Sequence, residues 1–252
     1  MKTNKYKLFL LGGYDLEMLT IKQMLEGRED CVIMDKHLQW DNARLSVYKD
    51  ALSGFAGYDI YGIELQEDVS LPLNYHRIDH HNDCADKPSS LEQVAEILCE
   101  TLSPYQQLVA ANDKGYIPAM QALGASAEEI DDVRRKDRAA QGVTEEDETL
   151  AEKAIAENLN IYKGVTMVKA FTSRFSPICD RLYPYKRLLI YTDAEWMFYG
   201  EGKAKLVKLL EEDISKKKVF HGGGDNGYIG TVQYAYDKTE IEEFIKQIIE
   251  EI

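Results

Sequence analysis

The pattern of apolar and polar residues predicts strands and helices that alternate along the first part of the chain. Short apolar runs, each bounded by glycine or polar residues, are typical of buried strands, and they occur at 7–11, 31–35, 59–64 and 75–79. Helical spacing predicts helices between them, over 15–25 and 41–52. Strands that alternate with helices form right-handed parallel crossovers, so we expect a doubly wound, mainly parallel α/β sheet.

Further helices follow the fourth predicted strand. Ser90 and Gln93 have the spacing of a capping box at the start of a helix that runs to Leu102. From 126 to 158 the chain is highly charged and helical, with a second capping box at its start and Gly142 dividing it into two helices. We interpret this stretch as a solvated helical connector.

The pattern changes after Gly164. Strands are predicted at 165–171, 187–191 and 195–199, and they are followed by an amphipathic helix over 203–214 and a final helix that Thr239 and Glu242 cap. This is the pattern of a smaller, mixed α/β domain. We therefore expect an N-terminal domain over 1–125, a helical connector over 126–160 and a C-terminal domain over 161–252.

Composition limits the class of protein. The chain has 252 residues, of which 44% are hydrophobic and 29% charged, as in ordinary soluble proteins. It has no apolar run long enough for a membrane span, and its first apolar run is too short for a signal peptide. The four cysteines are widely spaced without a C-x-x-C pair, so we expect reduced thiols and a cytoplasmic location.

The net charge of −14 restricts the partners. Binding to duplex DNA or RNA depends on the neutralisation of phosphates by basic residues, so we do not expect a duplex nucleic acid partner. A small phosphorylated ligand is compatible with this charge if metal ions supply the positive charge. The sequence is also compatible with a homodimer.

Acidic residues and histidines recur just after the predicted strands. They are Asp15 and Glu17 after the first, Glu64 at the end of the third, Asp79, His80 and His81 after the fourth, and Asp113 after a later apolar run. Binding sites of open parallel sheets form at the carboxyl ends of the strands, so these side chains are candidates for one common site. Taken singly, each acid is better explained as a surface charge or a helix cap, and only the shared position at strand ends favours a site.

Carboxylates gathered in this way would repel one another, and some would have to be protonated unless cations bind. Two divalent ions a few ångströms apart would resolve the repulsion and provide a site for phosphoryl chemistry. Oxygen-rich ligation with one imidazole favours Mn²⁺ or Mg²⁺ over Zn²⁺.

A glycine-rich loop lies in the C-terminal domain. It runs from Gly222 to Gly230 and includes Gly223, Gly224, Asp225 and Asn226. Its backbone amides are free of side-chain obstruction and could bind an anion. A tight turn between two strands explains the same residues equally well.

These motifs together resemble the DHH family of phosphoesterases. Asp79-His80-His81 looks like the family signature, and Asp15-Leu16-Glu17 is similar to its first motif, two aspartates separated by one residue. Glu64 and Asp113 fall where the aspartates of the second and fourth motifs are expected, and the glycine loop resembles that of the family's C-terminal associated domain. The family includes single-strand exonucleases, oligoribonucleases, cyclic-dinucleotide phosphodiesterases and manganese pyrophosphatases.

The resemblance implies a role for each candidate residue. Asp15 would bind one metal ion and Glu17 the second, with Glu64 bridging them, and His80 and Asp113 would complete the second site. Asp79 would orient His80, and His81 would contact the scissile phosphate. The substrate would also contact the C-terminal loop, through Gly222, Gly223, Gly224, Asp225 and Asn226.

The chain departs from the family pattern at several positions. A histidine normally opens the first motif, where this chain has Leu11; Glu17 and Glu64 replace aspartates; and Asp225 replaces the histidine of the glycine loop. His37 is a candidate replacement for the missing ligand. The departures leave open whether the site holds two ions, one ion or none.

Two hypotheses follow. The first is a metal-dependent phosphoesterase, an enzyme that acts on a small phosphorylated or nucleotide substrate in the cleft between the domains. The second is a catalytically inactive relative that binds a ligand or has a regulatory role. The recurrence of acids and histidines at strand ends favours the enzyme, and the four substitutions favour the second hypothesis.

Overall fold

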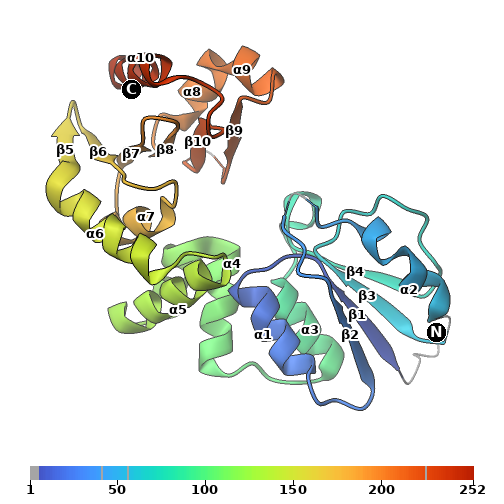
Figure 1. Cartoon of the computed structure of the whole chain (residues 1–252). Coiled ribbons are helices and arrows are strands. Elements are labelled where there is room, and N and C mark those ends of the chain that lie inside the picture. Colours follow the sequence, from blue (N-terminus) through green and yellow to red (C-terminus); the bar gives the residue numbers. More distant parts are fainter. Residues whose placement is uncertain (1–5, 41, 56, 225) are drawn as a thin grey trace. The chain divides into compact units, whose positions relative to one another are not determined.

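The chain divides into two compact units, Met1–Gly142 and Val143–Ile252. The computed structural model describes residues 6–40, 42–55, 57–224 and 226–252. Within these ranges no helix is both long and apolar enough to cross a lipid bilayer. The first unit holds a parallel sheet and the second a mixed sheet, each with helices, so the predicted α/β fold class is confirmed (Figure 1).

A parallel sheet forms the centre of the first unit. Its strands stand in the order β2-β1-β3-β4, and all neighbouring pairs run parallel. Their bounds are β1 Lys7–Leu11, β2 Cys31–Asp35, β3 Asp59–Ile63 and β4 Tyr75–Ile78. Because the strands point the same way, their carboxyl ends lie along one edge of the sheet.

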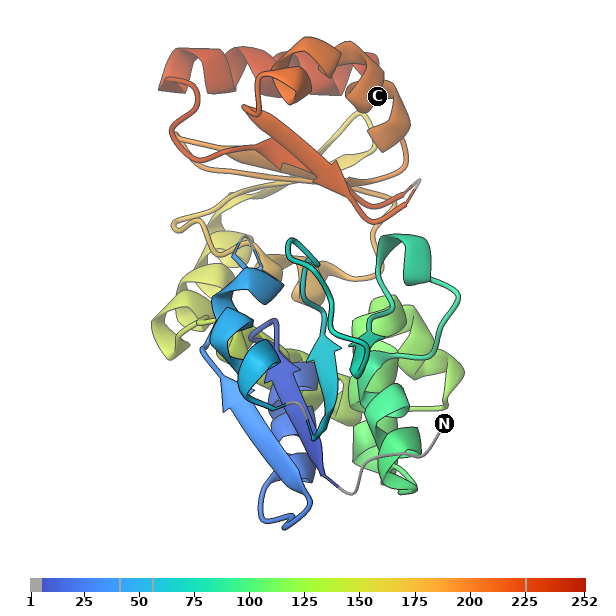
Figure 2. The ribbon, with the colours of Figure 1, turned by 90° about the vertical axis from the view of Figure 1, so that its right-hand side faces the viewer.

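Helices cover both faces of this sheet (Figures 1 and 2). One face carries α1 Leu16–Leu25 and α3 Ser90–Leu98, against which α4 Pro104–Ala122 and α5 Ala127–Ala140 pack. The other carries the short 3-10 helix η1 Leu45–Tyr48 and α2 Lys49–Gly54. Leu8 and Leu10 of β1 pack against Leu45 and Tyr48 on this second face. The doubly wound arrangement thus follows from strands that are apolar on both sides.

Two details of the first unit differ from the sequence prediction. Residue 41 of the helix expected over 41–52 lies outside the described residues, and the described part forms a 3-10 turn followed by the short α2. The capping box of α3 is formed by Ser89 and Glu92, one residue before the predicted pair. Ser90 is unavailable as a cap because its hydroxyl donates a hydrogen bond to Glu64 Oε1, at 2.7 Å.

A six-stranded mixed sheet forms the second unit, in the order β5-β6-β7-β8-β10-β9. Only the β6–β7 pair is parallel among these neighbours. The bounds are β5 Leu159–Tyr162, β6 Val165–Lys169, β7 Arg187–Tyr191, β8 Trp196–Gly200, β9 Val219–Gly222 and β10 Tyr228–Thr231.

Helices also cover both faces of the second sheet. They are α6 Glu145–Asn158, α7 Ser176–Leu182, α8 Lys203–Leu209, α9 Glu211–Ser215 and α10 Lys238–Glu251. Trp196 and Phe198 pack with residues of α8 and α10 on one face, and Val168 and Leu188 pack with residues of α6 and α7 on the other.

Three local predictions for the second unit need correction. The amphipathic helix over 203–214 is broken at Leu210, whose φ of −106° leaves the helical range. The final helix is capped by Asp237 and Glu240, not by Thr239 and Glu242. The strand β5 follows α6 directly and was not predicted from the sequence, because its four residues are all exposed and show no buried face.

The stretch expected to be a connector, 126–160, is shared between the two units. Its first helix, α5, contacts α1 and α4 of the first unit, and its second helix, α6, contacts α7 and β6 of the second. The capping box of Ser126 and Glu129 at the start of α5 is confirmed.

Gly12, directly after β1, provides a test of the tight packing at the edge of the first sheet. A Cβ at this position would lie 2.3 Å from Ile63 O and 2.4 Å from Glu64 O, both backbone atoms that cannot move aside. We expect Gly12→Ala to lower the free energy of unfolding by about 1–3 kcal/mol, measured by urea denaturation. Gly54→Ala is the matched control, because a Cβ there has no atom within 4 Å. Equal stability of the two variants would contradict the packing described.

Candidate metal centre

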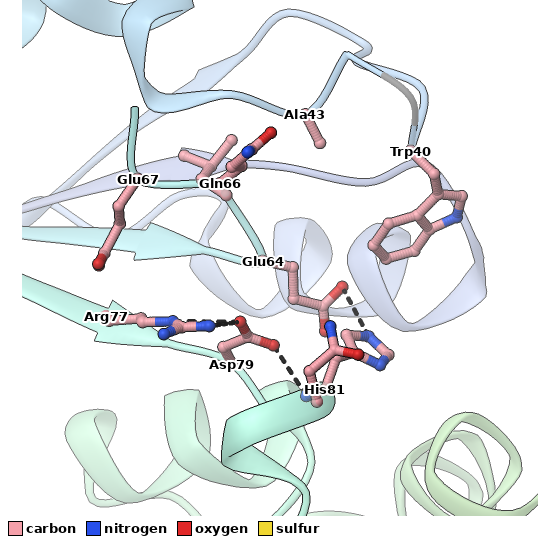
Figure 3. A pocket seen from close by; sticks show the side chains of 10 residues that line it. Trp40, Ala43, Glu64, Gln66, Glu67, Arg77, Asp79 and His81 are labelled. Carbon is pink, nitrogen blue, oxygen red and sulfur yellow. Dashed lines mark hydrogen bonds and ion pairs between the residues drawn. The ribbon is translucent and has the colours of Figure 1, made fainter. Parts of the chain in front are cut away.

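Histidine and carboxylate side chains converge at the carboxyl edge of the parallel sheet. Glu64 follows β3, His80 and His81 follow β4, and Asp113 lies in α4. Each offers one ligand atom, and these atoms all lie within 4.8 Å of one another. We refer to these four residues as the metal cluster. Figure 3 shows Glu64 and His81 directed toward each other across the edge of the sheet.

The centre of the metal cluster is His80 Nε2. It lies 2.5 Å from Asp113 Oδ2, 3.3 Å from Glu64 Oε1 and 3.6 Å from Glu17 Oε2. His81 Nε2 lies 3.7 Å from Glu64 Oε2, and the two imidazole rings are 4.2 Å apart between centroids. One imidazole therefore faces carboxylates from three different segments of the chain.

The donor atoms of this site fit a divalent cation. Glu17 Oε2, His80 Nε2, His81 Nε2 and Asp113 Oδ2 are buried and have no partner in hydrogen-bond geometry among the described residues, although they lie close together. Buried polar atoms without hydrogen bonds are costly, and ligation of an ion removes that cost. Carboxylates with imidazole are a donor set that suits Mn²⁺.

The charges of the site shift the pKa values of its members. Burial raises the pKa of Glu17 to about 8, although the nearby His80 imidazole acts in the opposite direction. For Glu64 burial acts in the same direction, but interactions with His80, His81 and Ser90 outweigh it and lower the pKa to about 2. Burial would lower the pKa of His80, but its carboxylate neighbours raise it to about 12. In the absence of an ion, a proton on His80 therefore balances the anions.

The position of Glu64 depends on an unusual backbone conformation. Its φ of 52° lies in the left-handed region, which is rare for a residue with a side chain. Its backbone N–H donates to Ile78 O at 2.8 Å, and its carboxylate accepts from the Ser90 hydroxyl at the start of α3. Such strain persists only where the surroundings fix it, and it is concentrated at functional sites.

The two acids of the predicted first motif lie beside the metal cluster but outside the set of four. Asp15 is the N-cap of α1, where its Oδ1 accepts from Met18 N at 2.9 Å. Burial, followed by the charges of Asp113 and Glu64, raises its pKa well above the usual value. Glu17 accepts from Leu91 N through Oε1 and directs Oε2 toward His80.

Asp79 contacts the backbone of His81, and not the imidazole of His80 as the resemblance implied. Its Oδ1 accepts from His81 N at 2.9 Å, and its Oδ2 accepts from Arg77 Nη2 at 2.6 Å. The same guanidinium also pairs with Asp83, at 3.1 Å. Asp79 therefore fixes the chain that carries His81 (Figure 3).

The remaining sequence candidates lie elsewhere. His37 is paired with Asp35 at 3.5 Å, and its side chain is 62% exposed, so it is not a member of the metal cluster. Leu11, in the position of the family's missing histidine, is buried.

The glycine loop lies in the second unit, in the hairpin between β9 and β10. Lys203 Nζ donates to the carbonyls of Gly222 and Gly224 and so fixes the loop. Asp225 lies outside the described residues. Binding of a substrate by Gly222, Gly223, Gly224 and Asn226 stays a prediction.

Sequence reasoning missed a buried ion pair beneath the site, Arg134 with Asp137 on α5. Asp137 Oδ1 accepts from Leu16 N at 3.3 Å, and Arg134 Nη1 donates to Asn112 Oδ1 at 2.9 Å. The pair, at 2.7 Å, thus joins the segment of Glu17 to the segment before Asp113. Arg134 and Asp137 are three residues apart on a highly charged helix, and a pattern of this kind is typical of a solvated surface.

A cavity of about 630 Å³ opens beside the metal cluster. It was not foreseen from the sequence, because its walls come from separate loops. Glu64, Asp79 and His81 line it together with Trp40, Ala43, Leu65, Gln66, Glu67, Arg77 and Asn82 (Figure 3). The site therefore joins a buried set of ligand atoms to a space that a small molecule can enter.

Comparison with known proteins identifies similar solved structures. No protein-family model matches the chain, and no curated protein matches it. The pGpG-specific phosphodiesterase PggH from Vibrio cholerae has a TM-score of 0.47 and 15% identity, covering 99% of this chain and 100% of that one. The DHH domain of a member of the s1p family of ribosomal proteins has a TM-score of 0.47 and 14% identity, covering 94% of this chain and 75% of that one.

RecJ from Thermus thermophilus in complex with Mn²⁺ has a TM-score of 0.46 and 11% identity, covering 98% of this chain and 52% of that one. Each of these matches extends over nearly the whole chain, with a sequence identity of 15% or less and a TM-score below 0.5.

The raised pKa values predict that metal binding depends on pH. An ion must displace the protons on Glu17, with a pKa of about 8, and on His80, with a pKa of about 12. The affinity for Mn²⁺ should therefore rise between pH 6 and 8, by about tenfold to a hundredfold per pH unit for one or two released protons. Titration calorimetry in buffers of different ionisation enthalpy measures both the affinity for Mn²⁺ and the number of protons released on binding. An affinity that is constant over this range would contradict the arrangement of charges.

Metal should also stabilise the fold, because an ion that binds only the folded state shifts the unfolding equilibrium. We expect Mn²⁺ to raise the melting temperature of the protein and a chelator to reverse the rise. His80→Ala should abolish the rise, and His37→Ala should retain it, because His37 lies outside the metal cluster. The same response in both variants would place the metal elsewhere.

Proposed function

We propose that the protein is a divalent-metal-dependent phosphoesterase that hydrolyses a small phosphorylated ligand, such as a nucleotide, in the cavity of its first unit. The observation that supports this best is the convergence of four ligand atoms within 4.8 Å of one another beside that cavity. That the substrate also reaches the second domain stays a prediction.

The buried members of the metal cluster are suited to hold the ion. The side chains of Glu64, His80 and Asp113 are at most 16% exposed, whereas that of His81 is 41% exposed. Glu17 adds a further carboxylate within 3.6 Å of His80. A bound Mn²⁺ or Mg²⁺ supplies Lewis-acid polarisation of a phosphoryl oxygen and a water of lowered pKa.

His81 offers one of the four candidate ligand atoms, but as the most exposed member we assign it to the substrate and not to the ion. It lines the cavity, and its ion pair with Glu64 raises its pKa, so it holds a proton at Nε2 more readily than a free histidine. This proton can neutralise a phosphate oxygen or be donated to the leaving oxygen. The hydrogen bond from His81 N to Asp79 fixes the backbone and so restricts where the ring can lie.

The charges that line the cavity favour a phosphodiester. The guanidinium of Arg77 is already paired with Asp79 and Asp83, so it brings no excess positive charge. Glu67 and Asp79 add anionic groups to the lining. A diester carries one negative charge and a monoester about two, so the diester meets less repulsion from these carboxylates.

The alternative is a protein that binds such a ligand without hydrolysing it. Leu11, where the resembled family has a histidine ligand, is 1% exposed, and its carbonyl accepts from the Tyr48 hydroxyl at 2.7 Å. This position therefore contributes an apolar side chain to the core. One ion in place of two would then be bound, and activity would require the missing ligand.

Turnover by the purified protein distinguishes the two functions. In the presence of Mn²⁺ we expect hydrolysis of bis(p-nitrophenyl) phosphate and of short oligonucleotides, with slower hydrolysis of p-nitrophenyl phosphate and pyrophosphate. His81→Ala should lower kcat by about a hundredfold or more, the usual contribution of a general acid. His76→Ala is the matched control, because His76 faces Asp59, away from the cavity.

Absence of turnover on every substrate, with Mn²⁺ shown to be bound by elemental analysis, would support the binding protein. In that case Leu11→His should increase the number of ions bound or restore hydrolysis. Turnover by the unmodified protein excludes the alternative.

A further inference from the structure

We propose that Trp40 forms a stacking subsite for a nucleobase, so that the ligand of this protein is recognised by its base as well as by its phosphate. The proposal deepens the proposed function and rests on it for the position of the phosphate. Trp40 lies in the loop between β2 and η1, outside the metal cluster and the glycine loop.

Trp40 is an exposed aromatic residue at a cavity. Its side chain lines the cavity together with Glu64 and His81, yet the residue is 48% exposed. Figure 3 shows its indole directed into the cavity toward these two residues. A planar ligand that stacks on the indole would cover this exposed aromatic surface.

The indole is held in place from two sides. Gly13 lies against its benzene half, since a Cβ at that position would come within 2.8 Å of the ring. His81 meets the indole edge to face, with centroids 5.7 Å apart and an interplanar angle of 85°. A ring fixed before binding loses little conformational entropy when a ligand stacks on it.

This contact with His81 sets the ligand's orientation. A phosphate beside His81 and the metal cluster places the group attached to it next to Trp40, because the two rings touch. The volume of about 630 Å³ exceeds what phosphate or pyrophosphate requires and lies in the range of small-molecule sites.

The other walls suit the edge of a base. Gln66 and Asn82 offer amide groups, and Glu67 offers a carboxylate, all of which can form hydrogen bonds with ring nitrogens and exocyclic amines. Stacking itself accepts any base, because each has an aromatic face. The arrangement therefore selects nucleotides over sugar phosphates.

Tryptophan fluorescence tests the proposal directly. The chain has two tryptophans, and Trp196, in the core of the second unit, is 0% exposed. Guanosine 5′-monophosphate, added with Mg²⁺, should quench the emission of Trp40, whereas ribose 5-phosphate should not. The dissociation constant of guanosine 5′-monophosphate, measured by calorimetry, should be about tenfold or more below that of ribose 5-phosphate.

Three variants assign the effect to Trp40. Trp40→Ala should weaken binding of guanosine 5′-monophosphate by about tenfold or more and leave the affinity for ribose 5-phosphate unchanged. Trp40→Phe should retain much of the affinity but abolish the quenching. Tyr105→Ala is the matched control, because Tyr105 is also an exposed aromatic residue of the first unit but contacts Lys136, away from the cavity.

Equal affinities for the two ligands, or a Trp40→Ala variant that binds guanosine 5′-monophosphate as well as the unmodified protein does, would overturn the proposal. These outcomes are separate from those for catalysis. Base-dependent binding without turnover would sustain the subsite and refute the phosphoesterase. Turnover that depends neither on the base nor on Trp40 would support the phosphoesterase and refute the subsite.

Discussion

Repulsion among buried carboxylates is the constraint on which the first unit depends. Glu17, Glu64 and Asp113 all lie within 3.6 Å of one imidazole nitrogen, that of His80. Burying like charges together is unfavourable unless a positive charge lies among them. Either a proton on His80 or a divalent ion can supply it, and the competition between the two links the charge of the site to its occupancy. The site is therefore stable only when a positive charge is bound, and a divalent ion that supplies this charge also supplies metal chemistry.

The surrounding fold resists this repulsion. The carboxyl edge of a parallel sheet fixes Glu64 and the two histidines, and the backbone of Glu64 adopts a left-handed conformation to aim its side chain. Beneath the site, Arg134 and Asp137 join the start of α1 to the middle of α4. Arg134 also stacks on Tyr116, at 4.6 Å from the ring centroid, where α4 is kinked. Rigid supports of this kind hold ligands in place before an ion binds.

The cavity determines how such a centre could be used. Glu64 and His80 are buried and the side chain of Asp113 is 16% exposed, whereas that of His81, at 41%, is the most exposed of the four. The ion and the substrate would therefore have separate partners, with His81 between them and Trp40 beside it. The candidate ligand atoms among the described residues lie within 4.8 Å of one another. Leu11, where the resemblance implied a further ligand, is buried and offers none.

The sequence by itself determined the α/β class, the parallel strands of the first unit and the acids and histidines at their ends. Those features depend on local periodicity and on the rule that sites form where parallel strands end. The tertiary structure decided which residues meet. Asp15 caps a helix beside the metal cluster, and His81 joins the cluster, although both follow strands in the same way. Arg134, Asp137 and Arg138 of α5 are buried because α5 packs against α1 and α4, and Trp40 reaches the cavity because Gly13 leaves room. Such contacts join segments far apart in the chain, and no local pattern contains them.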